Sequence, residues 1–149
     1  MERGQPLTWS ESFSVGHDEL DRQHRLLVDA INEVEAAARD PHRPERLERA
    51  VHALREKART HISGENALLR DIQSGIYQLP HTRLEAQRFL LQMAASALDQ
   101  HTAQHETLLM RLDAIVEGPR HELYESLKSW FVDHAITHDL PLKALFQAV

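Results

Sequence analysis

The sequence predicts an all-α protein, an up-down-up-down four-helix bundle in a single domain over residues 1–149. Apolar residues recur at steps of three and four along four long stretches, and turn-forming residues separate these stretches. No stretch shows the alternation of a half-buried strand, and no repeat of fixed period is present. A chain of 149 residues buries about two-thirds of its unfolded surface around one core, so no second domain is needed.

The turn-forming residues set the limits of each element in order along the chain. Gly16 closes an N-terminal arm over residues 1–17, and the segments PHRP, SGIYQLP and GP separate the helices that follow. We expect an insertion, in the form of an extra or extended helix, at about 74–93 between the second and third helices. The helices themselves are expected at about 18–39, 44–73, 81–117 and 120–139.

Composition excludes several classes of partner and of metal site. With 17 Lys and Arg against 23 Asp and Glu, a net charge of −6 leaves no broad basic face for nucleic acid or anionic lipid. The absence of cysteine excludes disulfides, thiolate zinc sites, cysteine-ligated iron–sulfur clusters and covalently attached haem. Neither an apolar signal core nor a run of ~20 apolar residues is present. We therefore expect a cytoplasmic protein that binds neither nucleic acid nor membrane.

Six side chains of metal-ligand type interrupt the four apolar seams. In the first helix, His24 takes a place in the series that includes Leu20, Leu27 and Ile31. A single buried histidine needs only a hydrogen-bond partner, but a glutamate buried among imidazoles would cost several kcal/mol without a cation. A binuclear metal site inside the bundle is therefore predicted. Its seam ligands are His24, His61, Glu65, His101, His105 and His134.

Helix lengths place these ligands at one height in the bundle. His24 lies 15 residues before the first helix end near Arg39, and His61 lies 17 residues after Pro44. At ~1.5 Å per residue, the first two helices therefore return their ligands to the same level, and the third and fourth helices agree. The predicted ligands can converge on one point.

The spacing of histidine and glutamate at four residues does not by itself select a site. It also occurs in three pairs that fall away from the seams and should face water. These pairs are His52 with Glu56, His81 with Glu85, and His121 with Glu125. His17 and His42 are likewise expected to be solvated, whereas Trp9, Phe13 and Trp130 are expected to have structural roles.

The last ligand position is contested between two neighbouring residues. On an ideal α-helix, His138 lies about 40° from His134, whereas Asp139 lies about 140° away. Spacing alone would choose His138. Leu140 and Pro141 indicate, however, that the helix is ending, which would free Asp139 to turn inward.

Four segments together resemble the hemerythrin family, in its bacterial form: WSESFSVGHDELDRQHRLLVDAIN, HISGE, HTAQH and WFVDHAITHD. The family carries an aspartate at position 139, so the resemblance favours Asp139 over His138. It implies two iron ions, joined by Glu65, Asp139 and an oxo or hydroxo bridge. By the same resemblance, one iron would be held by three histidines and the other by two, with dioxygen binding at the open position of the second. These ligand sets are His101, His105 and His134 for the first iron, and His24 and His61 for the second.

The chain departs from the family pattern mainly between the second and third helices. Glu65 and His101 are separated by 35 residues. Either the third helix overshoots the bundle, or residues 76–93 form an extra helix that folds over its end and caps the site. The apolar cluster Phe89, Leu90, Leu91 and Met93 then either packs locally or forms a dimer or partner surface. Two smaller departures are Ile62, where the family usually has phenylalanine, and Asn66, where it often has a second acid.

Three functions are compatible with these features. We expect reversible dioxygen binding, for storage or transport, and no enzymatic activity. The first alternative is a dioxygen or redox sensor that signals to a partner or fused output domain, or within a homodimer, through residues 76–93 or the C-terminal tail. The second is a di-iron oxidoreductase acting on peroxide or nitric oxide, which has less support because the sequence shows no additional acid, base or substrate cleft.

Overall fold

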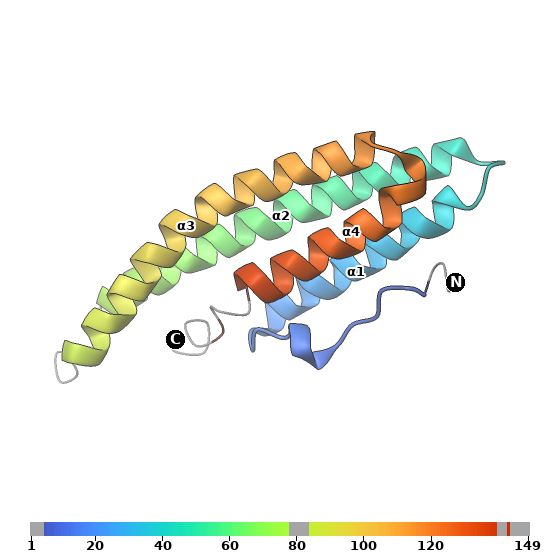
Figure 1. Ribbon diagram of the computed structural model, residues 1–149. Helices are drawn as coiled ribbons and strands as arrows, with labels where there is room; N and C mark the ends of the chain where they lie inside the picture. Colours follow the sequence, from blue (N-terminus) through green and yellow to red (C-terminus); the bar gives the residue numbers. More distant parts are fainter. Residues whose placement is uncertain (1–4, 78–83, 140–142, 144–149) are drawn as a thin grey trace.

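The computed structural model describes residues 5–77, 84–139 and 143, and it confirms the all-α bundle (Figure 1). Helices α1 and α3 each pack against both α2 and α4, so consecutive helices are neighbours that run in opposite directions. No described helix combines the length and the apolar composition that a membrane span requires. The elements are η1 (Glu11–Phe13), α1 (Asp18–Ala38), α2 (Pro44–Tyr77), α3 (Leu84–Glu117), η3 (Arg120–Glu122), α4 (Leu123–Val132) and the π-helical η4 (Asp133–Asp139).

The start of α1 follows from local chemistry. Gly16 has φ of 72°, a left-handed conformation that glycine adopts without strain, and it turns the chain into the helix. His17 then caps α1, because its Nδ1 accepts a hydrogen bond of 3.3 Å from the backbone N–H of Leu20. His17 is half-buried, so the expectation that it is solvated is wrong. Acidic residues in the first turn complement the helix dipole.

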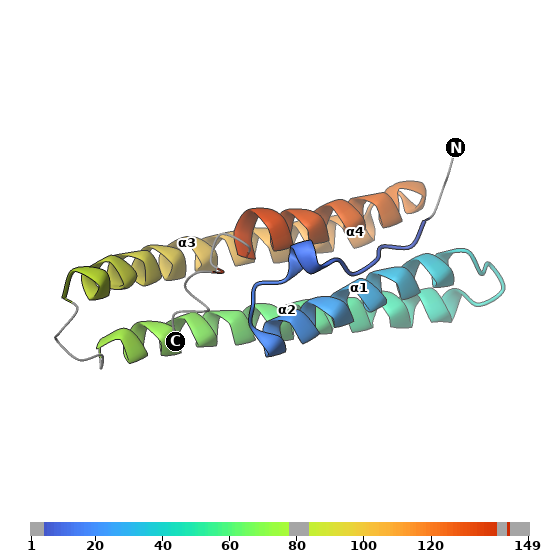
Figure 2. The same cartoon turned by 90° about the horizontal axis from the view of Figure 1, so that it is seen from below.

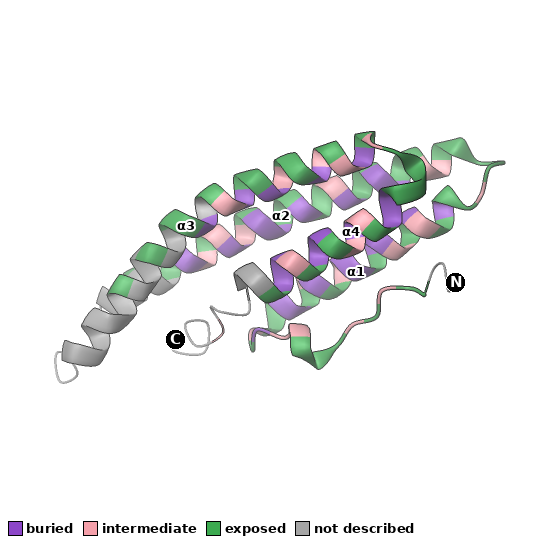
Figure 3. Ribbon diagram, viewed as in Figure 1, coloured by how far each residue is buried: buried purple, intermediate pink, exposed green. Residues whose placement is uncertain are grey.

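The apolar core occupies the part of the bundle nearest the α1–α2 and α3–α4 connections. Its members are fully or almost fully buried and come from the inward face of every helix (Figure 3). They include Leu27, Ile31 and Val34 of α1, Leu54 and Ala58 of α2, Leu108 and Leu112 of α3, and Leu123, Leu127 and Phe131 of α4. This region matches the seams expected from the sequence and anchors the helices that carry the site.

The N-terminal arm lies along the α1–α4 pair (Figure 2). The backbone N–H of Leu7 donates to Asn32 Oδ1 of α1 and to the Tyr124 hydroxyl of α4, at 2.9 Å each. Further along the arm, the ring of Phe13 contacts that of Phe131 edge-on, with centroids 5.5 Å apart. The arm therefore covers the seam between these two helices.

Helices α2 and α3 both continue beyond the ends of α1 and α4 (Figures 1 and 2). The second helix runs to Tyr77, beyond the end expected near residue 73, and the third is described from Leu84 onward. Residues 84–93 belong to α3 itself, so the insertion is an extended helix pair rather than an extra helix folded over the site. Residues 78–83 and the side chains of the cluster Phe89, Leu90, Leu91 and Met93 lie outside what the structure describes.

Candidate metal centre

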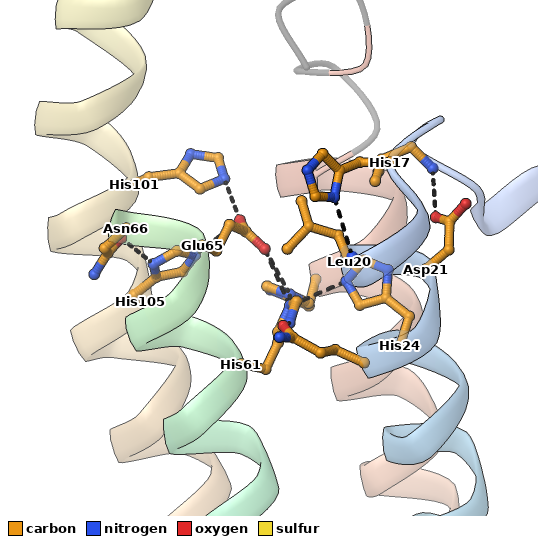
Figure 4. Close-up of polar contacts among 12 residues, drawn as sticks. His17, Leu20, Asp21, His24, His61, Glu65, Asn66, His101 and His105 are labelled. Atoms are coloured by element: carbon orange, nitrogen blue, oxygen red, sulfur yellow. Dashed lines mark hydrogen bonds and ion pairs between the residues drawn. The ribbon is translucent and has the colours of Figure 1, made fainter. Parts of the chain in front are cut away.

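All four helical segments contribute to one buried cluster of ligand-type side chains (Figure 4). Its six members are at most 4 % exposed, although all are polar or charged. They are His24 of α1, His61 and Glu65 of α2, His101 and His105 of α3, and His134 of η4. By contrast, His42, His52 and His121 are exposed as expected, and His81 lies outside the described residues.

The first part of the cluster is centred on His61. Its Nε2 atom lies 3.0 Å from Nε2 of His24, 2.9 Å from Nε2 of His134 and 3.0 Å from Oε2 of Glu65. The ring planes of these histidines are steeply inclined to one another, so their nitrogens meet edge-on rather than by stacking. Four ligand atoms, each from a different side chain, thus lie within 4.8 Å of one another.

The second part of the cluster uses the other oxygen of the same carboxylate. Nε2 of His101 and Nε2 of His105 each lie 3.3 Å from Oε1 of Glu65. These three atoms also fall within 4.8 Å of one another. Glu65 is therefore shared, with Oε2 facing one group of nitrogens and Oε1 facing the other, as a carboxylate that bridges two cations would be.

The burial of Glu65 fits the presence of cations. The side chain is 0 % exposed and is surrounded by imidazole rings. Removing a carboxylate from water costs several kcal/mol unless positive charge compensates it. Neutral imidazole nitrogens and carboxylate oxygens form a donor set that suits iron, and the two groups offer one place for an ion each. The residues present therefore fit two metal ions.

His134 lies between the two groups. Its ring centroid is 5.1 Å from that of His61 and 5.8 Å from that of His105. The family resemblance assigns His134 to the same iron as His101 and His105, whereas its Nε2 lies 2.9 Å from Nε2 of His61, in the first ligand group.

The π-helical winding of η4 changes the geometry of the last ligand position. Hydrogen bonds in a π-helix join residues five apart, so its turn is wider than that of an α-helix and the α-helical angles used for positions 138 and 139 do not apply here. The backbone of η4 does not choose between His138 and Asp139, and Asp139 stays a prediction. The side chains of His138 and Asp139 lie outside the described residues.

Two amide side chains next to the ligands were not among the expected site residues. Gln23 precedes His24 in the chain, and its Oε1 lies 2.8 Å from Nδ1 of His61. Asn66 follows Glu65, and its Oδ1 lies 2.8 Å from Nδ1 of His105 (Figure 4). Their place in the sequence could have indicated this role, because an amide next to a metal ligand on one helix can reach a metal ligand on the neighbouring helix. Such partners orient metal-binding histidines.

Large aromatic side chains enclose the cluster on the α4 side. The Trp130 ring stacks on His134 at an interplanar angle of 11°, and its Nε1 donates to the carbonyl of Leu108 at 2.9 Å. The Phe131 ring meets His24 edge-on, with centroids 5.9 Å apart. Both aromatic residues are at most 1 % exposed, so they separate the polar cluster from water.

No curated protein matches the chain. The model of the family described as hemerythrin HHE cation-binding domain matches residues 15–140, a span that includes every described member of the cluster. The chain therefore belongs to the hemerythrin family.

Proposed function

We propose that the chain is a non-haem di-iron protein that binds dioxygen reversibly. The observation that carries the proposal is the position of Glu65, whose two oxygens face two separate groups of histidine nitrogens at 3.0 and 3.3 Å. When bound, two ferrous ions would supply the electrons and the open coordination position that dioxygen binding requires. In this proposal the ligands are the six residues of the cluster together with Asp139.

The ratio of ligand types supports binding over oxidation of a substrate. Bundle proteins that activate dioxygen commonly use a carboxylate-rich set, in which glutamates from all four helices surround the metals. Here five histidines accompany the single described carboxylate of Glu65. We therefore propose a carrier or storage protein rather than an enzyme.

The surrounding side chains support the same proposal by excluding water. Trp130 and Phe131 cover the cluster from α4, and Leu69 and Ile62 of α2 are buried at the same level. An apolar jacket lowers the local dielectric and limits the access of water and protons to the bound ligand. Ile62 belongs to this jacket as a bulky side chain that carries no polar atom.

Iron loading and visible spectra test the proposal. The metal-free chain is loaded anaerobically with Fe²⁺, exposed to dioxygen and then returned to an oxygen-free atmosphere. We expect two iron ions per chain and a visible charge-transfer band that appears with dioxygen and disappears on its removal over repeated cycles. A chain that takes up iron but shows no reversible band would overturn reversible binding.

A second candidate function, dioxygen or redox sensing, is favoured by the extended helix pair. Glu65 lies on α2 and both His101 and His105 lie on α3, the two helices that run on past the bundle (Figure 2). A change at the ligands would be carried along these continuous helices. Sensing predicts one-way oxidation of the iron and a change in hydrogen exchange of the α2 and α3 extensions between the reduced and oxidised forms. Hydrogen exchange that is the same in the reduced and oxidised forms would exclude a sensing role for the extended helix pair.

A further inference from the structure

Gln23 connects a buried ligand to the protein surface. Its side chain is half-buried on α1, where its Oε1 lies 2.8 Å from Nδ1 of His61 on α2. Its Nε2 donates to Oε1 of Glu19, one turn earlier on α1, at 3.1 Å. Glu19 in turn accepts two hydrogen bonds from Arg22, at 2.9 and 2.6 Å. The four side chains form one continuous series from an exposed ion pair to the metal centre.

The exposed end of this series fixes the orientation of the Gln23 amide. Hydrogen bonds from Arg22 and then Gln23 lower the pKa of Glu19 to about 2, so its carboxylate is ionised at neutral pH. An ionised carboxylate only accepts hydrogen bonds. The NH₂ group of Gln23 must therefore face Glu19, and its carbonyl oxygen must face His61. The oxygen and nitrogen of an amide are nearly identical in size, so their hydrogen-bond partners decide which way the Gln23 amide points.

The orientation of the amide then fixes the tautomer of His61. Because the carbonyl oxygen of Gln23 only accepts, Nδ1 of His61 must carry the proton and donate. Nε2 of the neutral ring is then the nitrogen with the lone pair. This is the atom that lies 3.0 Å from Glu65 Oε2 at the middle of the first ligand group.

We propose that Gln23, oriented by Glu19 and Arg22, is a positioning residue that keeps His61 in the Nδ1-protonated tautomer and so tunes the metal that His61 binds. The inference rests on the proposed metal centre. A neutral amide leaves the ring less basic than a carboxylate partner would, which favours the ferrous state that dioxygen binding needs.

Gln23 lies where its role can be tested by substitution. Gln23 and His61 line the inner wall of a hollow of about 190 Å³ between α1 and α2, which is open to solvent. A Cβ atom added at Gly64 would lie 3.6 Å from Gln23 Nε2, an ordinary van der Waals contact, so the amide faces α2 at this glycine without crowding its backbone. A side chain of similar length therefore fits at position 23 without rearranging the apolar core.

The test compares three forms of the full chain with the wild type. Gln23→Met keeps the length of the side chain but removes the acceptor. Gln23→Glu together with Glu19→Gln moves the carboxylate next to His61 and keeps a donor behind it. Gln100→Met is the matched control, because Gln100 also precedes a ligand histidine but is exposed and donates to Ser96.

Two measurements on these forms have defined outcomes. In the metal-free chain, imidazole ¹⁵N shifts should show the Nδ1–H form of His61 in the wild type, the double variant and Gln100→Met, and loss of that preference in Gln23→Met. In Co²⁺ titrations, Gln23→Met should bind one of two ions about 10- to 100-fold more weakly. The double variant should keep wild-type affinity, and its iron-loaded form should have a lower reduction potential.

Three results would overturn the inference. The first is a Gln23→Met chain with unchanged tautomer and Co²⁺ affinity. The second is a double variant whose reduction potential equals that of the wild type, because packing alone would then explain the role of Gln23. The third is a wild-type His61 that carries its proton on Nε2. A wild-type chain that failed to bind two ions would instead contradict the proposed function, and the ¹⁵N measurement on the metal-free chain would still test the hydrogen-bonded series.

Discussion

The two halves of the bundle differ in what the same four helices bury. The half that contains the α1–α2 and α3–α4 connections, here the apolar half, fills its seams with residues such as Leu54, Leu112 and Leu127. The other half, here the ligand half, continues the seams with five histidines and Glu65. Burial of apolar side chains is favourable by itself, whereas burial of a carboxylate requires compensating charge. The apolar half should therefore hold the fold, and the ligand half should depend on metal.

The largest expected effect comes from replacing the shared carboxylate in the ligand half. Glu65→Gln should abolish occupancy by two ions, because one side chain serves both groups. At free metal 1,000-fold above Kd, each ion adds about 4 kcal/mol to the free energy of unfolding, and the variant should lose this gain. Metal analysis and thermal unfolding with and without Fe²⁺ measure both effects.

A matched control for this variant lies on the same helix. Glu56→Gln removes an exposed carboxylate that also lies four residues after a histidine. It should keep two ions per chain. Loss of iron from the Glu56 variant, or retention of both ions by the Glu65 variant, would refute the distinction between buried and exposed pairs.

The next effect concerns the apolar half and should not depend on metal. Leu54 is 0 % exposed in the core. Leu54→Ala should lower the free energy of unfolding by about 2–5 kcal/mol, through lost burial and the cavity it leaves. Urea unfolding of the chelator-treated and iron-loaded chains should give the same difference. A loss seen only in the iron-loaded chain would mean that the two halves are not separable.

Trp130 joins the two halves, and its replacement should have a smaller effect on both. Trp130→Phe removes the hydrogen bond to Leu108 in the apolar half and reduces the stacking on His134 in the ligand half. We expect about 1 kcal/mol of lost stability and a small shift of the visible spectrum of the iron-loaded chain. Trp9→Phe is the control, because the Trp9 Nε1 bonds to an exposed partner, Glu11. Equal effects of the two substitutions would contradict a bridging role.

The smallest effect is expected at the exposed end of the ligand half. Because the pKa of Glu19 is lowered from 4.5 to about 2, its ion pair contributes stability above pH 4.5 that is lost as the pH falls toward 2. The difference in stability between wild type and Glu19→Gln should thus be constant at neutral pH and vanish in strong acid. The ¹³C shift of the Glu19 carboxyl should titrate near pH 2. A midpoint above 4.5 would exclude the hydrogen-bonded series at this end.

Periodicity predicted the bundle and most of the cluster because the same physics produces both. A seam position is buried whatever residue occupies it, so His24 and His105 could be placed inside from the spacing of their apolar neighbours. The same reasoning placed His52 and His121 in water, where the structure has them. Helix packing decides which of these side chains are buried, and a packed helix face appears in the sequence as a regular spacing of apolar residues.

The remaining features depend on contacts between helices or on the local helix type, and neither produces a regular pattern in the sequence. An argument from a fixed angle per residue could not reveal the π-helix of η4, in which the α-helical angles of His138 and Asp139 no longer apply. The length of the insertion was evident from the 35 residues between Glu65 and His101, but its division between α2 and α3 was not. Gln23 lies off the seam and matters only because α2 brings His61 within 2.8 Å.

The most direct test of the account is the number and magnetic coupling of the iron ions in the oxidised wild-type chain. Iron analysis combined with electron paramagnetic resonance measures both. If Glu65 joins two ions in one centre, the chain should hold two irons and give no signal from isolated high-spin ferric iron, because the coupled pair has no net spin. One iron per chain, or two irons that give the isolated ferric signal, would contradict the shared carboxylate.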